Sequence, residues 1–348
     1  MLIANTSLVS LDVHAIALPV WNPKVFGNTM PVRHALPRKT LVPDRFASLH
    51  RAHMLRRLLS QPVVFVFWLL HFLPLTVLAC IGNALGSLLY LSGKHRRNVV
   101  KINLDWCFPE LSSDERTRLA KDHFRVLGRT ILERSILWWG NRERLERMIR
   151  IEGAEKIRAL LDAGKPIILL APHFVGLDAG GVAVAMRFDS LSMYAEQANP
   201  VFDRLLLNGR RRFGDQMLLT RQDGIRATVK AMKSGRPFYY LPDLNARRRE
   251  SIFVPFFGIQ TATITGLSRL SRAAGATVLT CVTRVLPGNQ GYLTEIGDPW
   301  ENFPTADPEA DTARMNAWIE TAIRTMPEQY YWVHRRFKTR PEGEKRPY

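Results

Sequence analysis

A charge-free apolar segment near the N-terminus constrains this chain more than any other feature. No Asp, Glu, Lys or Arg occurs from Leu58 to Gly93. About 20 apolar residues suffice for a helix to cross a bilayer, so residues 54–93 are predicted to form a helical membrane anchor that spans or dips into the membrane. Pro74 should kink it, and Gly82 with Gly86 should loosen its second half. A buried pair of core helices would give the same pattern.

The charge balance of the chain points to an anionic partner. Lys and Arg number 49 against 31 Asp and Glu, which gives a formal net charge of +18 over 348 residues. Such an excess suits nucleic acid, phospholipid headgroups or an acidic protein. Arg56 and Arg57 precede the apolar segment, and Lys94 to Arg97 follow it. Basic residues at both ends favour anionic membrane lipid, but they leave the orientation of the anchor undecided.

The three cysteines argue against a disulfide framework or a zinc site. Cys80, Cys107 and Cys281 are widely spaced, odd in number and lack the CxxC or Cys/His spacing of metal sites. We expect them to be small core residues, and we expect no metal and no cofactor.

The sequence divides into four regions. Residues 1–53 show no sustained period, whereas Met54 opens a run that leads directly into the anchor. We therefore expect residues 1–53 to be a poorly ordered or mis-annotated extension. Residues 94–150 follow the anchor and predict amphipathic helices that pack on the domain after them, with a helix cap at Ser112 or Ser113. Residues 151–348 form the fourth region, which ends in a basic tail.

Short apolar strands alternate with polar helices from residue 151 onward. The expected strands are PIILLAP, LSMYAE, PFYYLPD and TVLTCVTRV, and the expected helices are 178–187, 200–213, 223–233, 265–274 and 312–326. This alternation predicts an α/β fold with a mostly parallel central sheet flanked by helices. In such sheets ligands bind beyond the carboxyl ends of the strands.

A histidine stands where the first of these strands ends. In APHFVGLDAG, His173 follows PIILL and Asp178 comes five positions later, in the expected first turn of a helix. Asp178 should accept the proton on one imidazole nitrogen, which leaves the other nitrogen free to act as a general base. Gly176 should leave room for a substrate. A histidine that merely caps the helix would give the same pattern.

Two arginine triplets leave strand ends on the same expected edge. Arg210 to Arg212 follow one strand, and Arg247 to Arg249 follow another, just before the apolar stretch FVPFFG. Arginine clusters of this kind bind phosphate, so in an anchored protein they suit a phosphorylated lipid. Phe253, Phe256 and Phe257 would line a groove for an acyl chain, although FVPFFG and TATITG fit a buried core equally well.

These residues together resemble the late acyltransferases of lipid A biosynthesis. The resemblance covers residues 54 to 348 and rests on His173-Phe174, Asp178, Asn199-Pro200, Gly209-Arg210, Arg212, Pro242-Asp243, Arg249, the FVPF stretch and the closing PEQYYWVHRRFKTRPEG. The His-x4-acid pair alone is shared by the wider glycerolipid acyltransferase superfamily. Asp178 stands where lauroyl-type members often have Glu, and Leu244 and Asn245 depart from an acidic or amide pair after Asp243.

The resemblance implies a membrane-bound O-acyltransferase of the bacterial inner membrane, with its catalytic domain on the cytoplasmic face. Such enzymes move a fatty acyl group from acyl carrier protein to a hydroxyl of a hydroxyacyl chain on a Kdo-modified lipid A precursor. His173 and Asp178 are then catalytic. Substrate binding falls to Arg210, Arg212, Asp243 and Arg249. Membrane or carrier-protein contact falls to His334, Arg335, Arg336, Lys338 and Arg340.

Three alternatives remain open at this point. A glycerophospholipid acyltransferase would share the His-x4-Asp pair. A cysteine nucleophile would replace the general base, but no cysteine stands in a motif with His173. A non-catalytic, basic, membrane-tethered binding protein would also fit the charge, yet the chain carries no recognisable nucleic-acid module and we expect no nucleic-acid partner.

Overall fold

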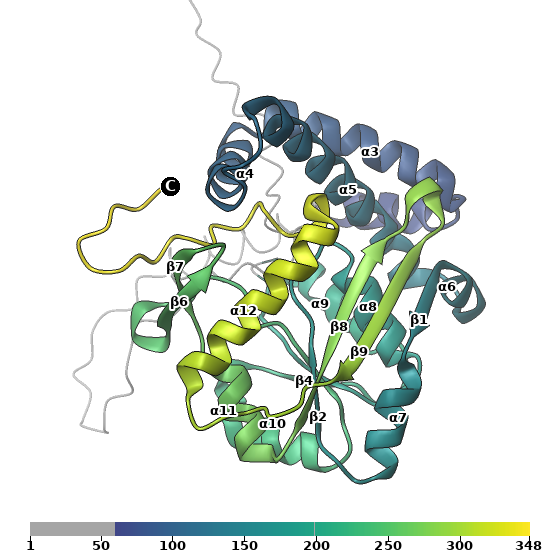
Figure 1. Cartoon of the computed structure of the whole chain (residues 1–348). Helices are drawn as coiled ribbons and strands as arrows, with labels where there is room; N and C mark the ends of the chain where they lie inside the picture. The colour runs from purple at the N-terminus through teal and green to yellow at the C-terminus, as the bar shows by residue number, and fades with distance from the viewer. Residues whose placement is uncertain (1–59, 198) are drawn as a thin grey trace, which may run out of the picture.

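The computed structural model describes residues 60–197 and 199–348, so the predicted extension 1–53 and the start at Met54 lie outside the described residues. Helices alternate with strands through most of the chain (Figure 1). The helices after Ser60–Leu70 are α3 (Leu75–Ser92), α4 (Lys94–Cys107), α5 (Ser113–Trp139), α6 (Arg142–Met148), α7 (Ala154–Asp162), α8 (Leu177–Ala185), α9 (Pro200–Arg210), α10 (Gly224–Lys233), α11 (Gly266–Ala274) and α12 (Pro308–Thr325).

A seven-stranded sheet forms the centre of the molecule in the order β1-β9-β8-β2-β5-β3-β4. Its strands are β1 (Ile149–Glu152), β2 (Ile167–Leu170), β3 (Leu191–Met193), β4 (Met217–Leu219), β5 (Phe238–Tyr240), β8 (Thr277–Val285) and β9 (Tyr292–Pro299). Only the β8–β9 pair is antiparallel; the other pairs are parallel. The predicted α/β class with a mostly parallel sheet is confirmed, and β6 (Ile252–Phe256) and β7 (Ile259–Thr263) form a separate hairpin.

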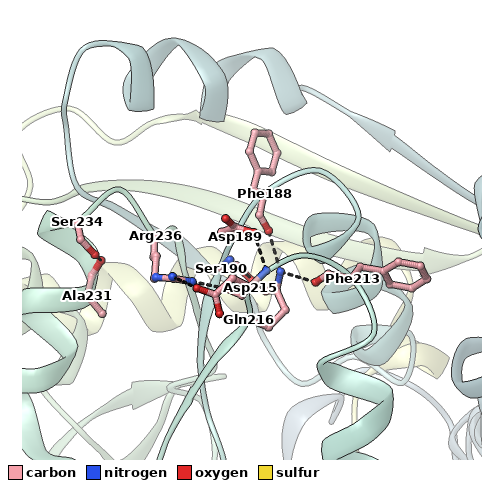
Figure 2. A network of polar contacts seen from close by, with 9 residues as sticks. All are labelled: Phe188, Asp189, Ser190, Phe213, Asp215, Gln216, Ala231, Ser234 and Arg236. Atoms are coloured by element: carbon pink, nitrogen blue, oxygen red, sulfur yellow. Dashed lines mark hydrogen bonds and ion pairs between the residues drawn. The ribbon is translucent and has the colours of Figure 1, made fainter.

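The amino ends of β3, β4 and β5 are fastened by a small polar network (Figure 2). The Gln216 side-chain amide donates to the carbonyls of Phe188 and Phe213 at 3.0 and 2.9 Å and accepts from the Ser190 N–H at 3.0 Å. Asp215 pairs with Arg236 in the turn before β5. These three short strands, of which β4 is the edge strand of the sheet, are therefore held in position by side chains as well as by the backbone hydrogen bonds between strands.

Proline divides the apolar N-terminal segment into two helices, as predicted. The helix Ser60–Leu70 ends four residues before Pro74, which precedes the first residue of α3. Among the described residues, α3 is the one helix long and apolar enough to cross a membrane by length and composition. Only 22% of its apolar window is buried, so the alternative of a buried core helix is not supported. Cys80 is exposed on α3 and is not the core residue we expected.

Glycines bring α3 against α5 along one face (Figure 1). A Cβ on Gly82 would lie 2.4 Å from the Arg129 Cα, and one on Gly86 would lie 2.1 Å from the Phe124 carbonyl oxygen. On the α5 side, a Cβ on Gly128 would lie 2.4 Å from the Gly82 carbonyl oxygen. Backbone therefore meets backbone here, and the expectation that Gly82 and Gly86 loosen the helix is wrong. They allow close packing.

The segment between the anchor and the sheet is helical, as predicted, and Ser112 caps α5. Its hydroxyl accepts from the Glu115 N–H, and the Glu115 carboxylate accepts from the Ser112 N–H, which makes a capping box. The expected strands did not include β1, β4, β6, β7 or β9. In β1 and β9 apolar residues alternate with polar or charged ones, unlike the continuous apolar run of β2. The division into four regions remains a prediction.

Candidate active site

The register of the sheet brings His173 and Asp243 to the same point. Leu170 of β2 pairs with Tyr240 of β5, and each strand is followed by a two-residue step that ends in proline. His173 and Asp243 then stand three residues beyond their paired strand ends. Since β2 and β5 are parallel neighbours, both side chains emerge at the carboxyl edge of the sheet.

Asp243 holds His173 by two hydrogen bonds. The Nδ1 of His173 lies 2.7 Å from one Asp243 carboxylate oxygen, and the His173 backbone N–H donates to the other at 2.9 Å. Asp243 is fully buried and His173 is 6% exposed. Burial alone would raise the pKa of Asp243, but His173 and a further hydrogen bond from Tyr330 keep it below its ordinary value. An ionised Asp243 fixes the Nδ1–H tautomer, so Nε2 of His173 is left to accept a proton.

Asp178 is not the partner that Nδ1 of His173 uses, which corrects the sequence-based expectation. It does lie in the first turn of α8, but its carboxylate accepts from Arg134 Nε at 2.6 Å and lies 3.9 Å from an Arg210 nitrogen. Burial works to raise the pKa of Asp178, and the two arginines outweigh burial and lower it. The charge of His173 also lowers the pKa of Asp178, but less than the arginines do. Asp178 is therefore close enough to interact with His173 by charge, without a hydrogen bond to its Nδ1.

The signal that pairs His173 with Asp243 was present in the sequence. Both LAPH and LPD place the functional residue directly after a proline that ends a strand. We took Asp178 because it was close in sequence and assigned Asp243 to substrate binding. His173 meets Asp243 because β2 and β5 are neighbours in the sheet. The order of the strands along the chain does not reveal that pairing.

The three predicted substrate-binding arginines lie in different environments. Arg210 ends α9 at the site, with long contacts to the Met193 carbonyl at 3.5 Å and to Asp178 at 3.9 Å. Arg212 donates to the carbonyl oxygens of Leu137 and Gly140 at the end of α5. Its guanidinium therefore caps the C-terminus of that helix. Arg249 is exposed. Of the three, Arg210 is the one that the fold brings close to Asp178, whose carboxylate in turn interacts with His173 by charge.

The aromatic stretch lies in the β6–β7 hairpin and the turn that joins its strands. Phe256 is fully buried, with Arg336 stacked over its ring at 5.1 Å, whereas Phe253 and Phe257 are half-buried. The structure therefore places Phe256 in the core. Gly176 also differs from expectation: a Cβ there would lie 2.9 Å from the Thr283 carbonyl oxygen, so the glycine permits contact with β8 and does not leave room for a substrate.

The basic residues after α12 do not form one exposed cluster. Arg336 is 2% exposed and donates to the Ala262 carbonyl and the Thr263 hydroxyl, so it cannot reach a membrane or a carrier protein. The Arg340 side chain is 7% exposed and stacks on Trp106. Arg335 and Lys338 are part-exposed. His334 is held by a hydrogen bond from the Asn245 N–H at 3.0 Å, which gives the unexpected Asn245 a structural role.

Both cysteines of the core are poor nucleophiles. Cys281 lies inside β8, where burial raises its pKa to about 12, and burial also raises the pKa of Cys107. Because the thiolate is the reactive form, neither supports a covalent route. The His173–Asp243 pair is therefore the candidate for the reactive group.

A histidine whose Nδ1 is held by a carboxylate at a sheet edge is an arrangement that can take a proton from a weak nucleophile, so the fold and the site fit an enzyme of the general-base class. Residues 47–339 match the family described as "Bacterial lipid A biosynthesis acyltransferase". The chain belongs to this family, and it is an acyltransferase of lipid A biosynthesis. The non-catalytic alternative is therefore wrong.

Curated relatives agree with this assignment. The chain is 36% identical over 279 residues to a lipid A biosynthesis lauroyltransferase of Escherichia coli K12, covering 80% of this chain and 90% of that protein. It is 33% identical over 281 residues to the palmitoleoyltransferase of the same organism, with the same two coverages. The corresponding myristoyltransferase is 31% identical over 274 residues, 78% of this chain and 83% of that one.

Proposed function

We propose that this enzyme moves a fatty acyl group from acyl carrier protein to a hydroxyl of a hydroxyacyl chain on a Kdo-modified lipid A precursor. The observation that carries the proposal is the hydrogen bond between His173 Nδ1 and Asp243, in a chain of this family. The relatives are lauroyl-, palmitoleoyl- and myristoyltransferases by name, which supports a fatty acyl donor.

His173 acts as the general base in the proposed reaction. Its Nε2 takes the proton of the acceptor hydroxyl as that oxygen attacks the thioester carbonyl carbon. The tetrahedral intermediate collapses, the carbon–sulfur bond breaks, and the proton on His173 passes to the leaving thiolate. Asp243 stabilises the imidazolium between the two proton transfers. No acyl-enzyme is required.

Arg210 is proposed to bind an anionic group of the acceptor. Its contacts among the described residues are long, at 3.5 Å to the Met193 carbonyl and 3.9 Å to Asp178, which supports a guanidinium whose five N–H donors still have bonds to make with a ligand. Asp178 holds Arg210 in place from one side, with Arg134 on the other side of that carboxylate. In this proposal the role of Asp178 is to hold Arg134 and Arg210. The exposed Arg249 is proposed to contact the acceptor as well.

The N-terminal helices are proposed to hold the enzyme on the inner membrane, with the catalytic domain on the cytoplasmic face. Large apolar side chains are exposed on both helices, among them Phe65 at 57%, Leu88 at 59% and Leu91 at 71%. An exposed apolar surface of this kind suits lipid contact. Arg335 and Lys338 are the basic residues of the tail that remain proposed contacts for an acidic carrier protein or for anionic lipid.

Mass spectrometry of lipid A from cells with and without the enzyme tests the proposal. Cells with the wild-type chain should carry one more fatty acyl chain, and cells with His173→Ala should not, because a general base contributes about 10²- to 10⁴-fold in rate. Purified protein should release carrier-protein thiol only when the lipid acceptor is present. An unchanged lipid A with altered glycerophospholipids would instead favour the glycerophospholipid acyltransferase.

A further inference from the structure

The segment after α12 runs past the active site, and the mechanism above does not use it. We call residues 327–334 the C-terminal strap. Its backbone pairs with the His173 loop: the Val175 N–H donates to the Gln329 carbonyl at 2.8 Å, and the Tyr331 N–H donates to the His173 carbonyl at 2.9 Å. Phe174 and Tyr330 form an isolated antiparallel bridge between these two bonds. The strap and the loop are thus fixed in one register.

Side chains from α4, α5 and the strap itself hold the strap from its other side. The Asn103 amide donates to the carbonyls of Trp332 and His334 at 2.7 and 2.8 Å, and a His123 ring nitrogen lies 2.9 Å from the Glu328 carbonyl. The Gln329 amide pairs with the backbone N–H and carbonyl of Val285 in β8, at 2.8 and 3.1 Å. The strap therefore joins the helical region to the sheet at the reactive histidine.

One side chain of the strap reaches the site itself. The Tyr330 hydroxyl donates to Asp243 at 2.9 Å, to the same carboxylate oxygen that accepts from the His173 N–H. Tyr330 is 2% exposed, and its ring packs edge-on against Trp332 with centroids 4.9 Å apart. Burial and the Asp243 charge raise the pKa of Tyr330, so its hydroxyl stays protonated and remains a donor.

We propose that Tyr330 is a positioning residue that acts through Asp243. Its hydroxyl fixes the orientation of the carboxylate and takes up part of its negative charge, so it sets how strongly Asp243 favours the protonated form of His173. This inference rests on the proposed general-base function. It assigns a role in the reaction to PEQYYWV, part of the closing stretch on which the family resemblance rests, beyond a role in folding.

The sign of the expected effect follows from the charges. Without the Tyr330 hydroxyl, the Asp243 carboxylate presents more negative charge to His173, and an adjacent negative charge stabilises the imidazolium. His173 then stays protonated, and unable to act as a base, up to a higher pH. A stronger donor at position 330 should have the opposite effect.

Kinetics of Tyr330→Phe against pH, measured on the full chain in detergent with acyl carrier protein and lipid acceptor, test the proposal. The value of kcat should fall about tenfold or more, the size expected for a hydrogen bond to a charged group, and the acid limb of kcat/KM should move to higher pH. Replacing Tyr330 by 3-fluorotyrosine, which keeps the volume and strengthens the donor, should move that limb to lower pH.

Tyr348→Phe is the matched control. Tyr348 donates its hydroxyl to the Asn103 side chain, and so it belongs to the same C-terminal region without contacting Asp243. It should lower thermal stability without moving the acid limb. An unmoved limb in both Tyr330 variants, or losses of kcat in all variants that follow loss of stability alone, would overturn the proposal.

A failed general-base function gives a different result. If the wild type does not turn over, the reaction proposed above is wrong, and the hydrogen bond is then examined without substrate. The Nδ1–H proton of His173 gives a downfield nuclear magnetic resonance signal because it is shared with Asp243. Tyr330→Phe should move this signal while Tyr348→Phe leaves it in place; an unmoved signal counts against the positioning role.

Discussion

At the scale of single residues, two aspartates have exchanged the partners that sequence reasoning expected, since the contact with His173 predicted for Asp178 is made by Asp243. Asp243 bonds to His173 Nδ1, and Asp178 bonds to Arg134. Their pKa values are both lowered, but by different partners: His173 for Asp243, and Arg134 with Arg210 for Asp178. The same residue type therefore holds the proposed general base in one place and pairs with arginines in the other.

Asparagine substitutions should separate these roles. Asp243→Asn removes the charge that stabilises the imidazolium and should lower kcat by about 10²-fold or more with a modest change in stability. Asp178→Asn removes the carboxylate that pairs with the buried Arg134 and lies near the half-buried Arg210, so it should lower the melting temperature more and kcat less. Steady-state kinetics and thermal unfolding of both variants would show this.

Asp122→Asn supplies the control for this pair, because Asp122 lies exposed on α5 beside Arg125 and should tolerate the change. The division of roles is wrong if Asp178→Asn abolishes turnover at unchanged stability while Asp243→Asn remains active.

At the scale of elements, the packing of α3 on α5 decides where the apolar helix lies. Gly82, Gly86 and Gly128 let the two backbones touch, and a small-residue seam of this type allows helices to approach closely. The remaining face of α3 exposes apolar side chains, including Ile81 and Leu88. The helix is thus attached to the catalytic domain by one face and available to lipid by the other.

Gly86→Ala should disrupt this seam. The new Cβ would lie 2.1 Å from the Phe124 carbonyl oxygen, and backbone atoms cannot yield as a flexible side chain does. The helices must separate, which should cost about 1–3 kcal/mol of unfolding free energy. Thermal unfolding of the detergent-solubilised protein measures the loss.

Gly181→Ala is the matched comparison for the seam. It makes the same change in helix α8, where a Cβ would meet its nearest neighbour at 3.9 Å. Because alanine favours helix more than glycine does, Gly181→Ala should raise stability by up to about 1 kcal/mol. Two variants that lose equal stability would show that the seam has no special role.

At the scale of the whole molecule, a buried histidine links folding to pH. His123 is fully buried on α5, and burial lowers its pKa to about 4, although its hydrogen bond to the Glu328 carbonyl opposes the shift. Between pH 6.5 and 4 the unfolded chain therefore binds a proton at this position that the folded chain does not. The contribution of His123 to the free energy of unfolding is fully present above pH 6.5. It falls as the pH is lowered toward 4, by up to about 1.4 kcal/mol per pH unit.

His123→Gln should make this dependence shallower, since glutamine still donates to the Glu328 carbonyl but does not titrate. Burial also lowers the pKa of His334, to about 3, so a further loss of stability in the same window remains in both proteins. Melting temperatures of the two proteins from pH 7 to pH 4.5 give the comparison. Asp178 and Asp243 do not contribute in this window, because their lowered pKa values make them lose stability only below about pH 4. Parallel curves for wild type and variant would contradict the assignment to His123.

Much of the fold was predictable because local pattern determines it. The longer apolar strands, the helix breaks at Pro74 and Ser112, and the position of His173 at a strand end all follow from near neighbours in sequence. Contacts between distant segments were not predictable. The pairing of His173 with Asp243 depends on strand order, and the burial of Arg336 depends on a hairpin some 75 residues earlier, which composition cannot reveal.

The strap also has a consequence for how the enzyme is made. Ribosomes deliver the chain from its amino end, and domains fold as they emerge. The apolar helices and β2, with His173, are therefore synthesised well before Tyr330. A nascent chain can reach the membrane with its base still lacking the strap contact, and the last of the described contacts at Asp243 forms only after residue 330 has left the ribosome. Full activity would thus arise only late in synthesis, once the enzyme already has access to its lipid.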